Sequence, residues 1–471
     1  MKKIKILFSK SKFPKLKKFS ANSENFFKAR IKNSDFKIKN GGVFANFDRK
    51  NNYSILTHLG TNEYDFNDLQ NLGAKGVRKA IGFQGEDDIE INLMFEQNFS
   101  REERKFIEKG ALMAEMKDDW YKSKEKNAKK SGTIEIKGVI TKNLRELVEA
   151  INIAREIQSK PSNKITPVTL EEYIKKNIDK KEFGLKITYH QQDFLGKEKM
   201  GLFLAVNQGS KDRAKMIQFE YNGGKKGEAP VVLIGKGLTY DSGGYYMKGY
   251  PHMNEMNGDM GGAATVIGIM ASLKKLGIKK NVVGIIGVTE NMVDANSYKN
   301  GDILTARNGK TVYVGHTDAE GRLVLADCLS YADDTFKPKM IFDFATLTGS
   351  CHHSLGEMYT GIFSDDKKLL DKIEELGRKT NDLCRQLPFD KRIKEAVKHK
   401  QADLSNVGKF KFMGAGEAAA FLSNFVKDTK KWVHCDIAGT GIRETQKQDY
   451  DLPNSFGTGT MITLMTEFLK K

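Results

Sequence analysis

Hydrophobic and polar positions change their pattern near residue 150. Residues 1–150 are polar and carry only short apolar pieces, such as YSILTHLG and IEINLMF. A helical pattern over 144–158 then leads into SKPSNKITP, whose prolines and polar residues mark a boundary. The pattern predicts two domains, residues 1–150 and residues 151–471, and a chain of 471 residues is long enough for both.

Apolar runs alternate between strand-like and helix-like lengths beyond this boundary. The order is APVVLIGKG, MGGAATVIGIMASLKKLG, NVVGIIGVTE, TVYVGHTD, LVLADCLSYADD, MIFDFATLTG, AAAFLSNFVKD and WVHCDIAGT. The helix over 260–277 is expected to end at Gly277, because glycine accepts the left-handed conformation that follows many helices. This βαβ alternation predicts an α/β fold whose mainly parallel central sheet is flanked by helices.

Composition narrows the class of protein. Hydrophobic residues make up 39% of the chain, and no apolar run approaches the roughly 18 residues of a membrane span. The basic N-terminus lacks an apolar core, so no signal peptide is expected. The four cysteines show no CxxC spacing. They predict buried free thiols of a cytoplasmic protein rather than a zinc cage or a disulfide framework.

The net charge of +18 is unevenly distributed. Residues 1–50 contain 15 Lys or Arg against three acids, and a further basic stretch spans 122–130. One interpretation is a patch that binds nucleic acid or another polyanion. The other is a solvated, lysine-rich surface, which the absence of a known nucleic-acid-binding signature favours.

The densest chemistry lies in HTDAEGRL, residues 316–323, where Asp318, Glu320 and Arg322 fall within five positions. The segment is expected to join a strand to a helix, at the sheet edge where α/β proteins bind ligands. Residues i, i+2 and i+4 share one face of an extended segment, so these three side chains are expected to point into one cavity. Because two close carboxylates repel each other, the segment predicts a bound cation.

More charged residues follow the other predicted strands. Lys236, Asp241 and Lys248 lie in and after the run VVLIGKGLTYDSGG, and Asp259 precedes the helix MGGAATV. Asp259 alone would be interpreted as a helix cap. Several acids that converge without a histidine suit an oxygen-rich site for a divalent metal.

Other catalytic motifs are absent. Gly309-Lys310-Thr311 resembles the end of a P-loop, but position 304 is Leu, and neither GxSxG nor HExxH occurs. His352 and His353 adjoin the turn TLTGS and are interpreted as a polar loop pair rather than as pocket residues.

The segments VLIGKGLTYDSGGYYMK, NGDMGGAATVIG, GDILTARNGKTVYVGHTDAEGRLVLAD and FATLTGS resemble the leucyl aminopeptidase family, the dinuclear-metal M17 exopeptidases. The resemblance spans about residue 150 to the C-terminus. It implies a catalytic domain over 151–471 and a smaller, variable N-terminal α/β domain. It also implies hydrolysis of the first peptide bond of peptides with a free N-terminus, preferably after Leu or another apolar residue, by a hydroxide that two metals activate.

The resemblance assigns roles to particular residues. Five positions correspond to the metal ligands: Lys236, Asp241, Asp259, Asp318 and Glu320. Lys248 would stabilise the developing oxyanion, and Arg322 would hold a bicarbonate that shuttles a proton. Met256, Thr346 and Gly349 would line the pocket for the first side chain, and His316 would also contact substrate.

The resemblance implies two divalent ions per subunit as cofactors, Zn²⁺ and/or Mn²⁺, with Co²⁺ or Mg²⁺ as alternatives. It also implies that the chain assembles as a homohexamer, a dimer of trimers. This chain departs from the family at His316, where Asn is usual, and at Glu417, where Thr or a small residue is common. A histidine at position 316 adds a titratable donor or an extra metal ligand. Three functions stay open: a peptidase, a polyanion-binding protein, and a non-catalytic homologue, which the intact ligand set disfavours.

Overall fold

The computed structural model describes residues 2–10, 27, 42–47, 53–59, 64–84, 87–116, 121, 123, 133–442 and 456–471. These residues form two compact units, the first within 1–149 and the second from 150–442 and 456–471. Most of the basic residues of segments 1–50 and 122–130 lie outside the described residues. Within the described part, no helix has the length and apolar character needed to cross a bilayer.

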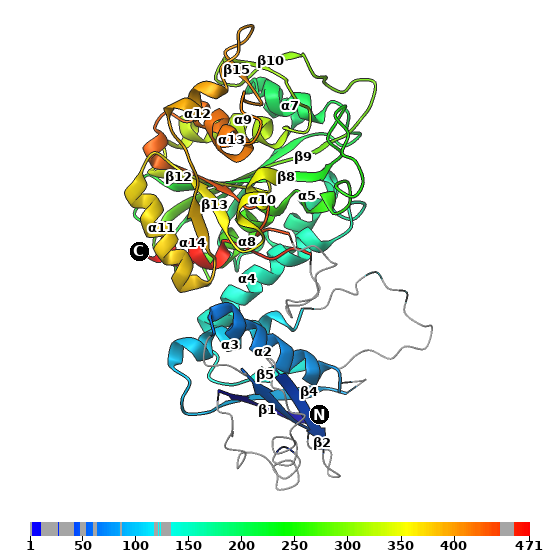
Figure 1. Cartoon of the computed structure of the whole chain (residues 1–471), viewed down its shortest axis with the longest axis vertical. Coiled ribbons are helices and arrows are strands. Elements are labelled where there is room, and N and C mark those ends of the chain that lie inside the picture. Colours follow the sequence, from blue (N-terminus) through cyan, green and yellow to red (C-terminus); the bar gives the residue numbers. More distant parts are fainter. Residues whose placement is uncertain are drawn as a thin grey trace. The chain divides into compact units, whose positions relative to one another are not determined.

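The described residues of the first unit form a sheet against which the helices α2 and α3 pack. Its strands follow the order β2-β3-β1-β4-β5, in which only β2 and β3 are antiparallel. The elements are β1 (Lys2–Ser9), β2 (Gly42–Phe47), β3 (Tyr53–His58), α2 (Phe66–Ile81), β4 (Ile89–Phe95), α3 (Arg101–Met113) and β5 (Ile134–Lys137). A Cβ at Gly73 would overlap the carbonyl of Ile107, and one at Gly110 would overlap that of Gln70. These two glycines therefore let α2 and α3 pack closely, side by side over the sheet (Figure 1).

The second unit contains an eight-stranded sheet of order β14-β13-β16-β12-β8-β9-β7-β6. Its strands are β6 (Lys186–Gln191), β7 (Lys215–Asn222), β8 (Val231–Asp241), β9 (Asn281–Asn291), β12 (Met340–Ala345), β13 (Thr360–Phe363), β14 (Cys384–Gln386) and β16 (Trp432–Asp436). The four central strands, β16, β12, β8 and β9, are parallel to one another. The predicted α/β fold with a mainly parallel central sheet is confirmed. Strand β8 is almost continuously buried, as expected for a strand that is covered on both faces.

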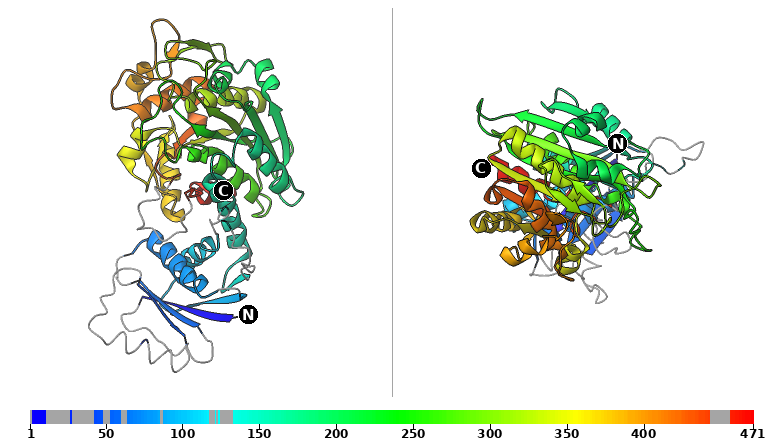
Figure 2. Two further views of the ribbon diagram at one scale, coloured as in Figure 1. Left: turned by 90° about the vertical axis from the view of Figure 1, so that its right-hand side faces the viewer. Right: turned by 90° about the horizontal axis from the view of Figure 1, so that it is seen from above.

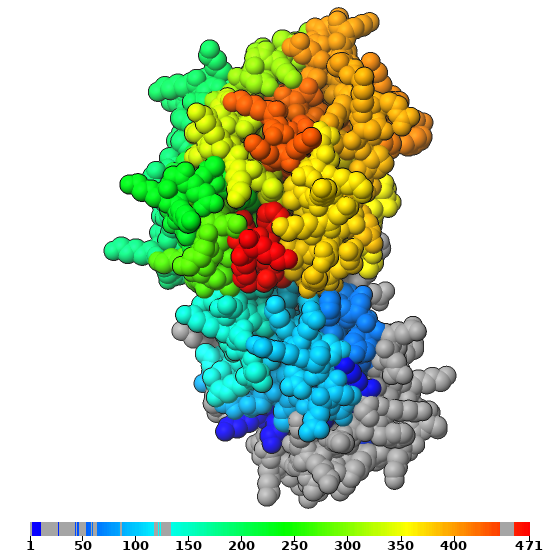
Figure 3. Space-filling model, turned by 90° about the vertical axis from the view of Figure 1, so that its left-hand side faces the viewer, coloured from blue at the N-terminus to red at the C-terminus, as the bar shows by residue number. Residues whose placement is uncertain are grey.

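Helices cover both faces of this sheet (Figures 1 and 2). One layer contains α7 (Gly201–Asn207), α9 (Gly321–Phe336) and α13 (Gly414–Leu422). The other contains α8 (Gly261–Ser272), α11 (Lys367–Thr380) and α14 (Ile462–Lys470), and Figure 3 shows the C-terminal residues at the surface beside α11. The other helices of the described residues are α4 (Lys142–Ser159), α5 (Pro167–Asn177), α6 (Gln192–Lys197), α10 (Gly349–Leu355), α12 (Lys391–Ala396) and the 3₁₀ turns η2 (Met256–Gly258), η3 (Ser423–Phe425) and η4 (Thr429–Lys431).

Helix α8 brings an acidic residue to the sheet edge. All twelve of its residues are buried, which is typical of a helix that is apolar on every side. A Cβ at Gly262 would overlap the Phe344 carbonyl, so the helix can start this close to the sheet only with glycine there. The regular helix ends at Ser272, before the predicted Gly277. A further turn closes in a Schellman motif, in which Gly277 has φ +67° and Ile278 N donates to the Leu273 carbonyl over 3.0 Å.

The strand predicted over 311–318 is shorter than expected and does not belong to the eight-stranded sheet. Strand β11 (Thr311–Tyr313) belongs to a separate three-stranded sheet with β10 (Ile303–Thr305) and β15 (Leu404–Ser405). Residues 314–320 form no strand, Thr317 and Asp318 lie in a turn, and Glu320 has helical backbone angles, φ −84° and ψ −39°. The prediction that the charged residues share one face of an extended strand is therefore wrong.

Candidate active site

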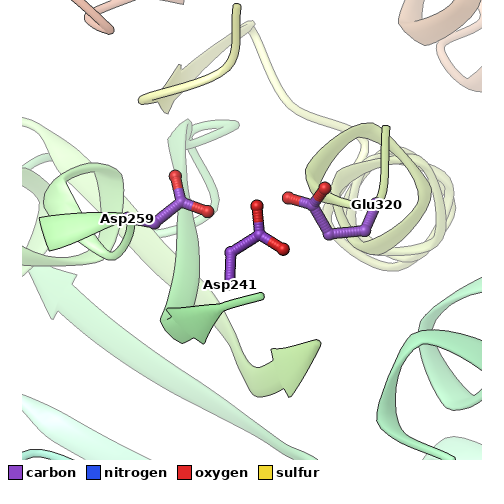
Figure 4. Close-up of side chains that lie close together, drawn as sticks. All are labelled: Asp241, Asp259 and Glu320. Atoms are coloured by element: carbon purple, nitrogen blue, oxygen red, sulfur yellow. The ribbon is translucent and has the colours of Figure 1, made fainter. Parts of the chain in front are cut away.

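Three carboxylates meet at the carboxyl end of the central strands. Asp241 is the last residue of β8, Asp259 follows η2 just before α8, and Glu320 immediately precedes α9. One oxygen from each lies within 4.8 Å of the other two, and all three side chains are buried. Figure 4 shows the three carboxylates turned toward a common space. The structure thus brings together acids that are 79 residues apart in the sequence (241 to 320).

Two lysines neutralise part of this charge. Lys236 Nζ, from β8, lies 2.8 Å from Asp259 Oδ2 and 2.9 Å from Glu320 Oε1, and donates to the Thr346 carbonyl over 3.1 Å. Lys248 Nζ lies 2.7 Å from Asp241 Oδ2 and also pairs with Asp318 Oδ1. Asp318 is outside the group of three oxygens but is joined to it through Lys248.

The electrostatics of the group reflect its burial. Burial raises the pKa of Asp259 to about 8, because Asp241 and Glu320 add to the effect and Lys236 only partly offsets it. Burial and the same two neighbours raise the pKa of Asp318 to about 7. Burial lowers the pKa of Lys236, but Asp259 and Glu320 outweigh it and hold the amine protonated, above its usual pKa. If all four acids were ionised, their charge would exceed that of Lys236, Lys248 and Arg322, so an added cation would favour the ionised carboxylates.

This donor set fits a divalent cation. Carboxylate oxygens suit Mg²⁺, Mn²⁺ and Zn²⁺, and each added positive charge relieves the repulsion among the acids. The Lys236 amine becomes a ligand only when it loses its proton, which a neighbouring metal charge favours. The group therefore suits metal ions on its chemistry as well as on its spacing.

Arg322 lies in the first turn of α9 and is buried. Its Nη1 donates to the Asn406 carbonyl over 2.7 Å, whereas its buried Nε has no hydrogen-bond partner among the described residues. Burial lowers the pKa of Arg322, and Glu320 counteracts that effect. A buried guanidinium with a free donor is suited to an anion.

The four predicted substrate residues lie in different surroundings. Thr346 is buried, and its Oγ1 donates to Asp259 Oδ1 over 2.7 Å, so it contacts the acidic group directly. Met256 opens the 3₁₀ turn that ends beside Asp259 and is half-buried. Gly349 is exposed, with open space where a Cβ would be. The His316 ring packs against the Tyr246 ring at a tilt of 40°, with 3.7 Å between centroids, and its Nδ1 accepts from Asp318 N over 3.1 Å.

Two further sequence features have structural explanations. Glu417 is buried, and its Oε1 accepts from Phe410 N over 2.7 Å, so the carboxylate fixes the loop over 408–410. His352 and His353 lie in the short helix α10 rather than in a loop, with ring centroids 6.3 Å apart.

Sequence reasoning did not identify the polar residues that orient the acids. Asn291 Nδ2 donates to Asp241 Oδ1 over 2.8 Å and to the Thr317 carbonyl over 3.2 Å. Thr317 Oγ1 donates to the Gly243 carbonyl over 2.8 Å and accepts from Tyr246 N. The only local signal was the position of Asn291 at the end of an apolar strand, on the same edge as Asp241.

The fold and this group define the class of protein: an α/β enzyme with a buried, oxygen-rich site at the carboxyl edge of its sheet. The sequence pattern of the cytosol aminopeptidase family, catalytic domain, matches residues 152–466. Cytosol aminopeptidase of Rattus norvegicus is 32% identical over 485 aligned residues, which cover 98% of this chain and 91% of that protein. The chain belongs to the cytosol aminopeptidase family, and the predicted family and enzyme class, aminopeptidase, are confirmed.

Bacterial relatives named as probable cytosol aminopeptidases are 37–40% identical to this chain, and the alignments span 62–75% of their lengths. Two solved structures share the fold with a TM-score of 0.84. A mutant of tomato leucine aminopeptidase is 27% identical, with 99% of this chain and 93% of that chain covered. A bottromycin maturation enzyme, BotP, in complex with Mn is 23% identical, with 99% and 98% covered.

Proposed function

We propose that this protein is a metal-dependent aminopeptidase that hydrolyses the first peptide bond of peptides, preferring Leu or another apolar first residue. The observation that carries the proposal is the buried group of Asp241, Asp259 and Glu320, whose oxygens lie within 4.8 Å of one another. Family membership supports the same reaction. A two-domain division at residue 150 is part of the proposal, with the peptidase in the second domain.

Five residues are proposed to hold two divalent ions: Lys236, Asp241, Asp259, Asp318 and Glu320. When bound, the ions supply activation of the attacking water and electrostatic stabilisation of the scissile carbonyl oxygen. Zn²⁺ and Mn²⁺ are the proposed ions, and the Mn complex of a protein with the same fold supports the second. Co²⁺ and Mg²⁺ are alternatives of similar ligand preference.

The basic residues act on the substrate. Lys248 is proposed to donate to the carbonyl oxygen as negative charge develops there, because it is the ammonium nearest to Asp241 and Asp318. Arg322 is proposed to hold a bicarbonate that moves a proton to the leaving amine, and its free, buried Nε supports an anion there. Met256, Thr346, Gly349 and His316 are proposed to contact the first residue of the substrate.

A panel of aminoacyl amides tests this function. The protein is stripped with a chelator, reconstituted with Zn²⁺, Mn²⁺, Co²⁺ or Mg²⁺, and assayed with Leu, Met, Ala, Asp and Lys amides. We expect activity to disappear on chelation, to return with Zn²⁺ or Mn²⁺, and to be highest with Leu or another apolar residue. Hydrolysis by none of the reconstituted forms would contradict the proposal.

Partners are proposed from the family and from charge. A homohexamer and a cytoplasmic location are proposed from the family resemblance, and the four buried free cysteines support the proposed location. The 15 basic residues of segment 1–50 support additional binding of nucleic acid or another polyanion. A salt titration on random duplex DNA tests this: affinity is expected at low salt and is expected to fall steeply as salt rises.

A further inference from the structure

Asn406 is a buried residue that contacts the acid-bearing segment from a distant part of the chain. It follows β15, the strand that pairs in parallel with β11 through Val312↔Leu404 and Tyr313↔Ser405. The backbone ladder ends there, and Asn406 N donates to the Tyr313 carbonyl over 3.1 Å. Its side chain, which is 0% exposed, continues along the segment that leads to Asp318 and Glu320.

Among the residues that the structure describes, the side-chain amide of Asn406 bonds only to backbone groups of this segment. Its Oδ1 accepts from Gly315 N over 2.8 Å and from His316 N over 3.3 Å. Its Nδ2 donates to the His316 carbonyl over 2.7 Å and to the Ala319 carbonyl over 3.2 Å. Two acceptor sites and two donor hydrogens are the full capacity of an amide side chain, so every one is used here.

The main chain of Asn406 also contacts Arg322, one of the proposed catalytic residues. Its carbonyl accepts from Arg322 Nη1 over 2.7 Å. One residue thus fixes the backbone on both sides of Asp318, at residues 316 and 319, and also the guanidinium that follows on α9. The segment itself is irregular and has no strand or helix ladder to hold it, since β11 ends at Tyr313 and α9 begins at Gly321.

We infer that Asn406 is a positioning residue of the active site, which sets Asp318, Glu320 and Arg322 in the geometry that metal binding and catalysis require. The inference rests on the proposed function of these three residues. Residues that orient metal ligands through hydrogen bonds typically change metal affinity or activity about 10–100-fold when they are removed. A displacement of about 1 Å has an effect of the same order on rate.

Asn406→Ala tests the inference, with Asn207→Ala as its matched control. Asn207 is also a buried asparagine with three side-chain hydrogen bonds, to the Asp212 carbonyl, Thr289 Oγ1 and Ala214 N. It holds a loop that carries none of the proposed site residues. Both variants are expected to lose thermal stability. Only Asn406→Ala is expected to lower kcat and Mn²⁺ affinity, each about 10–100-fold.

Hydrogen exchange provides a readout that does not depend on activity. Amides in the peptide over 314–323 are expected to exchange faster in Asn406→Ala, and at the wild-type rate in Asn207→Ala. Wild-type kcat and Mn²⁺ affinity in folded Asn406→Ala would overturn the inference. If Asn406→Ala does not fold, Asn406→Asp, which keeps the two accepted bonds but not the donated ones, decides by the same criteria.

The exchange experiment also separates this inference from the proposed function. A wild-type protein that hydrolyses no aminoacyl amide would remove the aminopeptidase proposal. Faster exchange over 314–323, with weaker Mn²⁺ binding, would still support the positioning role of Asn406. Unchanged exchange in an active enzyme would remove that role alone.

Discussion

Lys248 illustrates how one side chain can serve two roles in the same site. Its ammonium pairs with Asp241 and Asp318, and those acids, with Glu320, hold its pKa above the usual value although burial lowers it. In the proposed reaction the same ammonium turns to the substrate oxygen. If Lys248 only held the carboxylates together, its removal would change metal binding. If it stabilises the transition state, its removal lowers the rate of catalysis.

Lys248→Ala is expected to lower kcat about 10²–10³-fold, the usual effect of removing one oxyanion donor. Mn²⁺ affinity is expected to stay the same or to increase, because a competing cation leaves the two acids. The measurement is steady-state hydrolysis of leucine amide together with metal titration. Lys215→Ala is the control, since Lys215 also forms a buried ion pair, 2.6 Å from Glu171, and its ammonium bonds to Glu171 and Gln191, neither of which is a proposed site residue. A fall in metal affinity with unchanged kcat would contradict the role.

At the scale of elements, the sequence predicted where the acids meet but not what holds them. Asp241 and Asp259 were predictable because each follows or precedes an apolar run that must lie in the sheet or against it. Asn406 was not, because a single asparagine in a polar loop has no periodicity and its contacts lie far away in the chain, as in the 90-residue separation from His316. Glu320 was predicted in an extended segment between a strand and a helix, whereas it has helical backbone angles immediately before α9, and the strand before it ends at Tyr313.

The approach of α8 to the sheet gives a prediction at this scale. Gly262→Ala places a methyl group against the Phe344 carbonyl, so the start of α8, and Asp259 with it, must shift. We expect a loss of about 1–3 kcal/mol of stability, as for other overpacked cores, and weaker Mn²⁺ binding. Gly196→Ala in α6 is the control, because a Cβ there meets no atom within 4 Å. Denaturant unfolding and metal titration measure both effects, and equal behaviour of the two variants would refute the argument.

At the scale of the whole molecule, metal binding and folding are linked. The acidic group is assembled from residues 241 to 320 and exists only in the folded second unit, so an ion that binds there stabilises that unit by mass action. The stabilisation is about 2.7 kcal/mol when the free ion is at 100 times its Kd. For a unit of about 300 residues, this corresponds to a rise in Tm of about 4 °C.

Calorimetry of chelator-treated protein with and without Mn²⁺ measures this shift. Asp259→Asn is expected to abolish most of it, because the variant removes one of the three converging carboxylates. Asp371→Asn, at an exposed position on α11, is expected to keep the wild-type shift. Any separate transition of the first unit is expected not to move, since the acidic group belongs to the second unit alone. An equal shift in Asp259→Asn and the wild-type protein would place the ion elsewhere and remove the metal site proposed here.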